Sequence, residues 1–260
     1  FGKHRIDATA LFSIFEQYDE YMQIQVEDLA YRSLWHNTGT GATIKAYTSD
    51  LIESSLASYM GRVNYTFNDK YLLTVTGRYD GASQLATDNK WAFFPSAALG
   101  WRLSEESFIE NLDVFSNLKL RVSYGEVGNN ASISPYATQS NIYQTVYDFD
   151  GSAANGYSID ALSNQGLVWE RSKEVNFGLD FALKKIGISG SIEIYKRNTE
   201  DLILNDNIPT STGFASAVDN VGEIENSGVE ITLNTVNVSK GDFKWSSDLT
   251  FTANKDKVVR

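Results

Sequence analysis

Long runs in which apolar and polar residues strictly alternate are the feature that most limits how this chain of 260 residues can fold. In the run LKLRVSYG at 118–125, leucine, valine and tyrosine occupy the even positions, and lysine, arginine and serine occupy odd ones. A period of two residues predicts a β-strand with one apolar face. The same alternation is found at 5–15, 59–67, 71–80, 91–103, 118–125, 174–183, 188–195, 229–234 and 243–253. The sequence therefore predicts an all-β fold of nine antiparallel strands.

The predicted strands are long, and their connections differ in length on the two sides. Most runs reach about ten residues, near the length that a tilted strand needs to cross a bilayer. Short turns at 68–70, 184–187 and 239–242, with an intermediate connection at 104–117, fall on one side. Long loops are predicted on the other side at 16–55, 129–166 and 201–225. This asymmetry is typical of an antiparallel transmembrane β-barrel of the outer membrane.

Charged residues gather on the polar face, and aromatic residues lie near the strand ends. The polar face includes Arg62, Arg121, Glu174, Asp180 and Glu193. Such a face is either the wall of a wet barrel interior or the solvated side of an ordinary sheet. The aromatic residues near strand ends are Tyr71, Trp91, Trp101, Trp169 and Trp245. They fit either the girdles at the two membrane surfaces or the core of a soluble β-sandwich.

Composition argues against several classes of function. The net charge of −11 makes the chain a poor nucleic-acid binder, because phosphate contacts need clustered cations. There is no cysteine, and the two histidines have no metal-ligand spacing. The acidic turn at 148–151 has the composition of a calcium loop but not the EF-hand spacing, so a plain turn is favoured. We predict that the protein is not an enzyme and holds no metal or other cofactor.

Several stretches of the sequence are familiar as a set. They read YMGRVNYTF at 59–67, NDKYLLTVTGRYDGAS at 68–83, KWAFFPSAALGWRLSEESF at 90–108, NLKLRVSYGEVGNN at 117–130 and LVWERSKEVNFGLDFAL at 167–183. IYKRNTEDLIL at 194–204 and NVGEIENSGVEITL at 220–233 follow. In this order, the chain resembles the barrel of a SusC/RagA-type TonB-dependent transporter of the Bacteroidetes outer membrane. The resemblance covers nearly the whole chain.

This resemblance implies a 22-stranded barrel with a plug domain inside, in contact with outer-membrane lipid. It also implies a SusD-like surface lipoprotein as the lid, energy from the TonB complex through the plug, and oligosaccharide or peptide cargo. Residues 1–260 are then a partial β-barrel domain, because nine strands do not make a closed even-numbered barrel. A passive outer-membrane porin and a soluble extracellular β-sandwich binding module are the alternatives.

The long loops are the predicted binding regions, because rigid scaffolds present function on loops. The candidate residues for substrate or lid binding are Trp35, Tyr47, Tyr136, Tyr143, Tyr147, Phe149 and Tyr157. Their rings suit sugar faces or a protein lid, and packing within the loops is the alternative role. On the strand at 174–183 we expect Val175, Phe177, Leu179 and Phe181 to face lipid. We expect Glu174, Asn176 and Asp180 to face the lumen.

Overall fold

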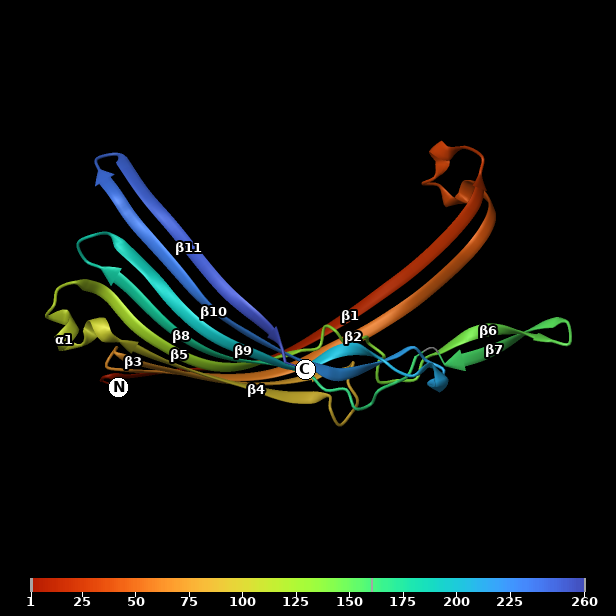
Figure 1. The fold of residues 1–260 in the computed structure, drawn as a ribbon, viewed down its shortest axis with the longest axis horizontal. Coiled ribbons are helices and arrows are strands. Elements are labelled where there is room, and N and C mark those ends of the chain that lie inside the picture. Colours follow the sequence, from red (N-terminus) through yellow and green to blue (C-terminus); the bar gives the residue numbers. More distant parts are fainter. Residues whose placement is uncertain (1, 160, 260) are drawn as a thin grey trace.

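The nine predicted strands form one antiparallel sheet. The structure is a computed structural model and describes residues 2–159 and 161–259. Within these residues the strand order is β1-β2-β3-β4-β5-β8-β9-β10-β11, and a separate two-stranded sheet pairs β6 with β7. The strands of the large sheet are β1 (His4–Leu29), β2 (Gly41–Phe67), β3 (Tyr71–Ala82), β4 (Trp91–Arg102), β5 (Phe115–Asn129), β8 (Glu170–Leu183), β9 (Ile188–Asn207), β10 (Ser216–Lys240) and β11 (Phe243–Val258). The sheet curves like a section of a wall (Figure 1).

The remaining elements are short. The hairpin strands are β6 (Ile142–Phe149) and β7 (Ser152–Ile159), and one helix, α1, covers Ser107–Glu110. Short 3-10 turns cover Arg32–Leu34, Thr38–Thr40, Leu103–Glu105 and Thr210–Thr212. No helix in the described part of the chain is long and apolar enough to span a membrane.

The register divides the sheet into two chemically different faces. Val122 of β5 is opposite Phe177 of β8, which is opposite Ile194 of β9. Directly paired residues share a face, so these side chains form an apolar row across three strands. Glu174 and Asp180 lie on the opposite face, where they bind arginine side chains. The predicted parity of β8 is therefore confirmed.

Two aromatic rows cross the apolar face and mark its limits. At the short-turn end, the rings of His4, Phe67, Tyr71 and Trp101 follow one another across β1 to β4. At the long-loop end, Phe12, Tyr59, Tyr79 and Trp91 do the same. Eight residues separate the rows on β3, which is roughly 26 Å along the strand. At a tilt of about 40°, this is roughly 20 Å along the membrane normal, which is most of the ~25 Å apolar band of a membrane barrel.

Two of the three predicted long loops are mostly strand, so their expected boundaries were wrong. The segment expected as a loop at 16–55 belongs largely to β1 and β2, which pair from His4–Phe67 to Leu29–Gly41. Likewise, β9 extends to Asn207 and β10 starts at Ser216, within the loop expected at 201–225. Beyond the membrane neither face meets lipid, so the alternating pattern stops while the backbone ladder continues. The third segment, 129–166, holds the β6–β7 hairpin.

The described sheet does not close on itself. Among the described residues, β1 pairs only with β2 and β11 pairs only with β10, so both edges are open. An open edge of this length has a row of unpaired backbone groups, which cannot be left exposed in lipid.

Candidate functional site

The buried core lies at the long-loop end of the sheet. It is formed by Ala82, Leu85, Ala92, Phe94, Ile133, Leu167, Trp169 and Ile203. Strand ends and three connecting segments contribute, and we call residues 83–90, 130–141 and 161–169 the loop platform. Trp169 is 5% exposed and contacts the Phe94 ring edge-on, with 5.5 Å between ring centroids. Trp169 is thus a core residue, so of the two positions left open for it by the sequence, the girdle is excluded.

The Phe94 ring lies so close to the backbone of Gly128 that only glycine fits at this position. A Cβ atom on Gly128 would lie 2.1 Å from Cζ of Phe94, so no side chain fits there without moving the ring. The guanidinium carbon of Arg171 lies 5.2 Å from the centroid of the same ring. Phe94 is therefore held between the end of β5, the start of β8 and Trp169.

Hydrogen bonds join the segments of the loop platform to one another and to β10. The Trp169 indole N–H donates to the carbonyl of Lys90 over 3.1 Å. The Asn220 side chain accepts from the Val168 amide at 2.9 Å and donates to the Val168 carbonyl at 3.1 Å. The Thr138 hydroxyl donates to the carbonyl of Gln84. These bonds satisfy backbone groups of the loops and make the platform a packed unit.

The β6–β7 hairpin extends from the loop platform away from the large sheet (Figure 1). It carries four of the seven predicted site residues, and all four are exposed: Tyr143, Tyr147, Phe149 and Tyr157. The register places Tyr157 opposite Gln144, so its ring is on the other face from the three β6 rings. The Tyr147 ring covers Gly156, where a Cβ would lie 2.2 Å from a ring carbon. The hairpin thus presents aromatic rings on both faces.

The other three predicted residues lie elsewhere. Trp35 is 77% exposed in the connection between β1 and β2, and Tyr47 is 83% exposed on β2. Tyr136 is half-buried in the loop platform, where its hydroxyl accepts a hydrogen bond from the amide of Glu53 at 3.1 Å. The seven residues therefore belong to three separate regions of the long-loop rim and do not form one cluster.

Tyr136 lines a cavity of about 290 Å³ between the platform and the β1–β2 hairpin. Its walls include Glu16, Tyr18, Glu53 and Gln139. The negative charge of Glu16 raises the pKa of the Tyr18 hydroxyl, and the charge of Glu53 acts in the same direction. Sequence reasoning placed Glu16 and Glu53 in one loop, but only the β1–β2 register shows that Glu53 is opposite Tyr18.

The inner face of the sheet carries an ion network. Arg121 donates to Asp180 at 2.8 and 2.9 Å and to Glu193 at 2.9 Å. Arg197 binds Glu174 at 2.6 Å. Nearby, a hollow of about 500 Å³ is lined by a mixture of polar and apolar residues, among them Ser96, Ser123, Ser172, Ala97 and Val127. This face is suited to a water-filled lumen, as the sequence predicted for its polar residues.

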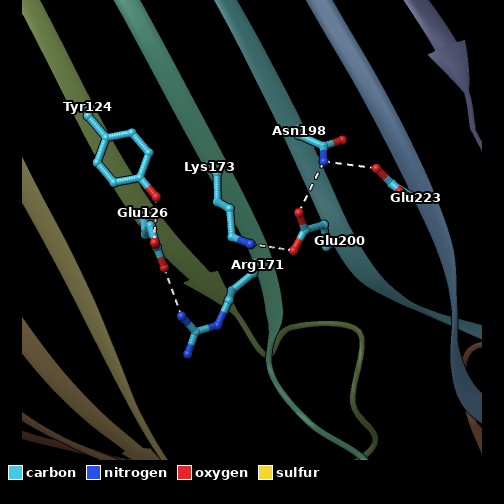
Figure 2. Close-up of polar contacts among 7 residues, drawn as sticks. All are labelled: Tyr124, Glu126, Arg171, Lys173, Asn198, Glu200 and Glu223. Atoms are coloured by element: carbon cyan, nitrogen blue, oxygen red, sulfur yellow. Dashed lines mark hydrogen bonds and ion pairs between the residues drawn. The ribbon is translucent and has the colours of Figure 1, made fainter.

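A second set of charged and polar residues lies where the apolar face ends, toward the long-loop rim. Figure 2 shows its members across β5, β8, β9 and β10: Tyr124, Glu126, Arg171, Lys173, Asn198, Glu200 and Glu223. Glu126 binds Arg171 at 2.8 Å, and Lys173 binds Glu200 at 2.5 Å. Glu126 is opposite Lys173, and Tyr124 is opposite Val175. These charged side chains therefore lie on the same face of the sheet as the apolar row. The apolar band therefore stops at Tyr124 and Val175.

The described residues bear on the sequence-based expectations for metal binding. No group of three or more His, Cys, Asp or Glu residues that could hold a metal ion is found among them. In the turn at 148–151, which has the composition of a calcium loop, the Gly151 amide donates to the Asp148 carboxylate at 2.9 Å. This is the geometry of a plain side-chain-capped turn.

Comparisons with known proteins agree with this architecture. The family model described as "TonB dependent receptor-like, beta-barrel" matches residues 7–259. TonB-dependent receptor P26 of Formosa agariphila is 41% identical over 212 residues, which cover 82% of this chain and 21% of that protein. TonB-dependent receptor SusC of Bacteroides thetaiotaomicron is 35% identical over 225 residues, covering 84% of this chain and 22% of SusC.

A solved structure agrees over almost the entire chain. The structure of the RagAB peptide transporter superposes with a TM-score of 0.88 at 25% identity, covering 99% of this chain and 28% of that chain. The chain thus spans between about a fifth and somewhat more than a quarter of the length of these proteins. With its two-faced antiparallel sheet and its aromatic rows, the chain belongs to the TonB-dependent receptor β-barrel family, a family of outer-membrane transport receptors and not of enzymes.

Proposed function

We propose that this chain is part of the wall and extracellular rim of an energy-coupled outer-membrane importer for oligosaccharides or peptides. The observation that carries the proposal is the two-faced sheet, which is apolar outside, ionic inside and ends in a packed loop platform. A water-filled passage needs the ionic face, and a membrane needs the apolar one. The similarity to SusC and to the RagAB peptide transporter supports the class of cargo.

The open sheet supports the proposal that residues 1–260 are a partial barrel domain. Each free edge needs a neighbouring strand in the membrane, and the full-length relatives are about four to five times longer than the matched region. We propose that the remaining strands close the barrel and that a plug domain fills it. Energy from the TonB complex would reach the cargo through that plug.

A SusD-like lipoprotein is the partner that we propose for the long-loop rim. The β6–β7 hairpin exposes aromatic rings on both faces, and a two-stranded hairpin of this kind is marginal without a partner. Tyrosine and tryptophan are the residues that dominate protein interfaces. We therefore propose that Tyr143, Tyr147, Phe149 and Tyr157 contact the lid, while Trp35, Tyr47 and Tyr136 contact lid or cargo.

Removing the hairpin in the full-length receptor tests the proposal. Ile142 and Ile159 are paired, so residues 143–158 can be replaced by an Asn-Gly turn without disturbing the platform. We expect normal heat-modifiable gel migration, loss of lid co-purification and poor growth on the cognate oligosaccharide or peptide. Thr145→Ala on the same hairpin face is the matched control. Normal lid association and growth without the hairpin would contradict its proposed role.

A passive porin is the alternative within the same fold. It predicts uptake that is independent of TonB, whereas the importer loses uptake when TonB is deleted. The soluble β-sandwich has no support, because the described strands form a single large sheet with no second large sheet packed on it.

A further inference from the structure

The connection between β4 and β5 differs from a simple turn in having an exposed apolar side. Residues 103–114, which we call the turn-rim segment, contain the 3-10 turn Leu103–Glu105 and α1. Phe108 and Leu112 are four residues apart and 58% and 57% exposed. Phe108 lies in α1 and Leu112 follows in a turn, where its amide donates to the Ile109 carbonyl, and we call these two exposed side chains the apolar ridge. Val114 and Ile186 are also exposed at this rim, where the Lys184 amide donates to the Val114 carbonyl.

The turn-rim segment folds onto the outer face of the sheet. Its Glu106 carboxylate accepts hydrogen bonds from the Tyr71 hydroxyl at 2.8 Å and from the Trp101 indole N–H at 3.1 Å. Tyr71 and Trp101 belong to the aromatic row at the short-turn end of the apolar face. The segment is therefore held directly against the girdle that meets lipid, and away from the lumen.

Ion pairs hold two carboxylates of the segment in place. Glu106 binds Lys70 at 3.0 Å, and Asp113 binds Lys184 at 2.9 Å and Lys185 at 3.0 Å. The hydrogen bond from Lys70 lowers the pKa of Glu106, and those from the two lysines lower the pKa of Asp113. The pairs fix the charged side of the segment, while more than half of the surface of Phe108 and of Leu112 is exposed. An apolar ridge beside paired charges is the pattern of an interfacial membrane segment.

We propose that Phe108 and Leu112 insert into the phospholipid leaflet at the short-turn rim, so that the turn-rim segment anchors the barrel and sets its depth. The partner is a phospholipid surface, because the segment that carries the ridge is hydrogen-bonded through Glu106 to the aromatic row at the edge of the apolar face. In outer-membrane barrels the short-turn rim faces the periplasm, so the leaflet is the inner one. This inference does not depend on which cargo the receptor carries.

Spin labelling of the full-length receptor tests this anchor. The chain has no cysteine, so Phe108→Cys, Leu112→Cys and Glu110→Cys each give one labelling site within it. Glu110 lies between the two ridge positions on the helical turn and serves as the matched control. Nitroxide labels are compared for collision with oxygen and with a water-soluble nickel complex in vesicles of phosphatidylethanolamine and phosphatidylglycerol. We expect a high oxygen-to-nickel ratio at 108 and 112, and a several-fold lower ratio at 110.

Other results would overturn the proposal. Equally low ratios at all three positions would mean that the ridge lies in water. Labels at 108 and 112 that are shielded from both reagents would mean that protein, such as a periplasmic part of the receptor, covers the ridge. TonB-dependent uptake by the same labelled receptors, measured in cells, reports separately on the importer function. Loss of uptake together with a high oxygen-to-nickel ratio at 108 and 112 would contradict the importer function and still support the membrane anchor.

Discussion

The connection between β5 and β8 contributes to two regions of opposite character. The loop platform buries Trp169 and Leu167 and joins its segments by hydrogen bonds, whereas the β6–β7 hairpin leaves Tyr143 and Phe149 in solvent. Both regions are aromatic, so aromatic content by itself does not indicate a binding surface. The two regions differ in what their aromatic rings contact. The rings of the platform pack on strand ends of this chain, whereas the rings of the hairpin make few contacts with the rest of the chain. The hairpin is therefore the better candidate for an external partner.

The largest effect on stability is expected from a substitution that disrupts the loop platform. Trp169→Ala removes a buried ring and its bond to Lys90, and we expect it to cost about 3–5 kcal/mol of unfolding free energy. Phe149→Ala on the hairpin should stay within about 0.5 kcal/mol, because the ring is exposed. Urea titration of the folded band on heat-modifiable gels measures both variants. A similar cost for the two would show that the hairpin is as packed as the platform.

The next prediction compares the two faces of β8. Leu179→Arg puts a charge on the apolar face, opposite Leu120 and Ile192, and should cost about 2–4 kcal/mol near the midplane. Asn176→Arg lies on the ionic face beside Glu193 and should be far milder. Equilibrium folding into vesicles measures the difference, and equal costs would reject the assigned faces.

A smaller effect on stability, with a large effect on function, is expected for the hairpin surface. Replacing Tyr143, Tyr147 and Phe149 together by serine should leave the unfolding free energy nearly unchanged, because all three are exposed. Lid co-purification should fall, because the interface loses its rigid aromatic contacts. Wild-type lid binding by this variant would move the proposed interface to the β1–β2 hairpin.

The smallest effect is expected at the opposite rim, where Asp113 is exposed. Hydrogen bonds from Lys184 and Lys185 lower its pKa from 3.8 to about 2. Because the folded pKa is the lower one, the pairing stabilises the fold above pH 4 and this contribution is lost as the pH falls through about 2. Asp113→Asn also suits the positive φ at this position. Thermal melting should show a small deficit of the variant at pH 7 that disappears near pH 2.

Much of the fold could be predicted because a membrane imposes a strict local rule. Each crossing strand meets lipid on one side and water on the other, so residues such as Val175 and Glu174 must alternate, and the nine strands were recognisable one by one. The ladder of β1 with β2 beyond Glu16 could not be predicted in this way. There both faces meet water, and pairing of backbone groups leaves no periodic signature in the side chains.

The candidate site shows the same limit. Trp101 and Trp169 both lie near a strand end and look alike in sequence, yet one is in the girdle and the other is in the core. The sequence by itself determined the all-β class, the two faces, the side of the sheet with long connections and the family. Only the tertiary structure decided which loop aromatics are buried, that Glu53 is opposite Tyr18, and that 103–114 lies on the outer face. Those facts depend on contacts between residues distant in the chain, for which local alternation carries no information.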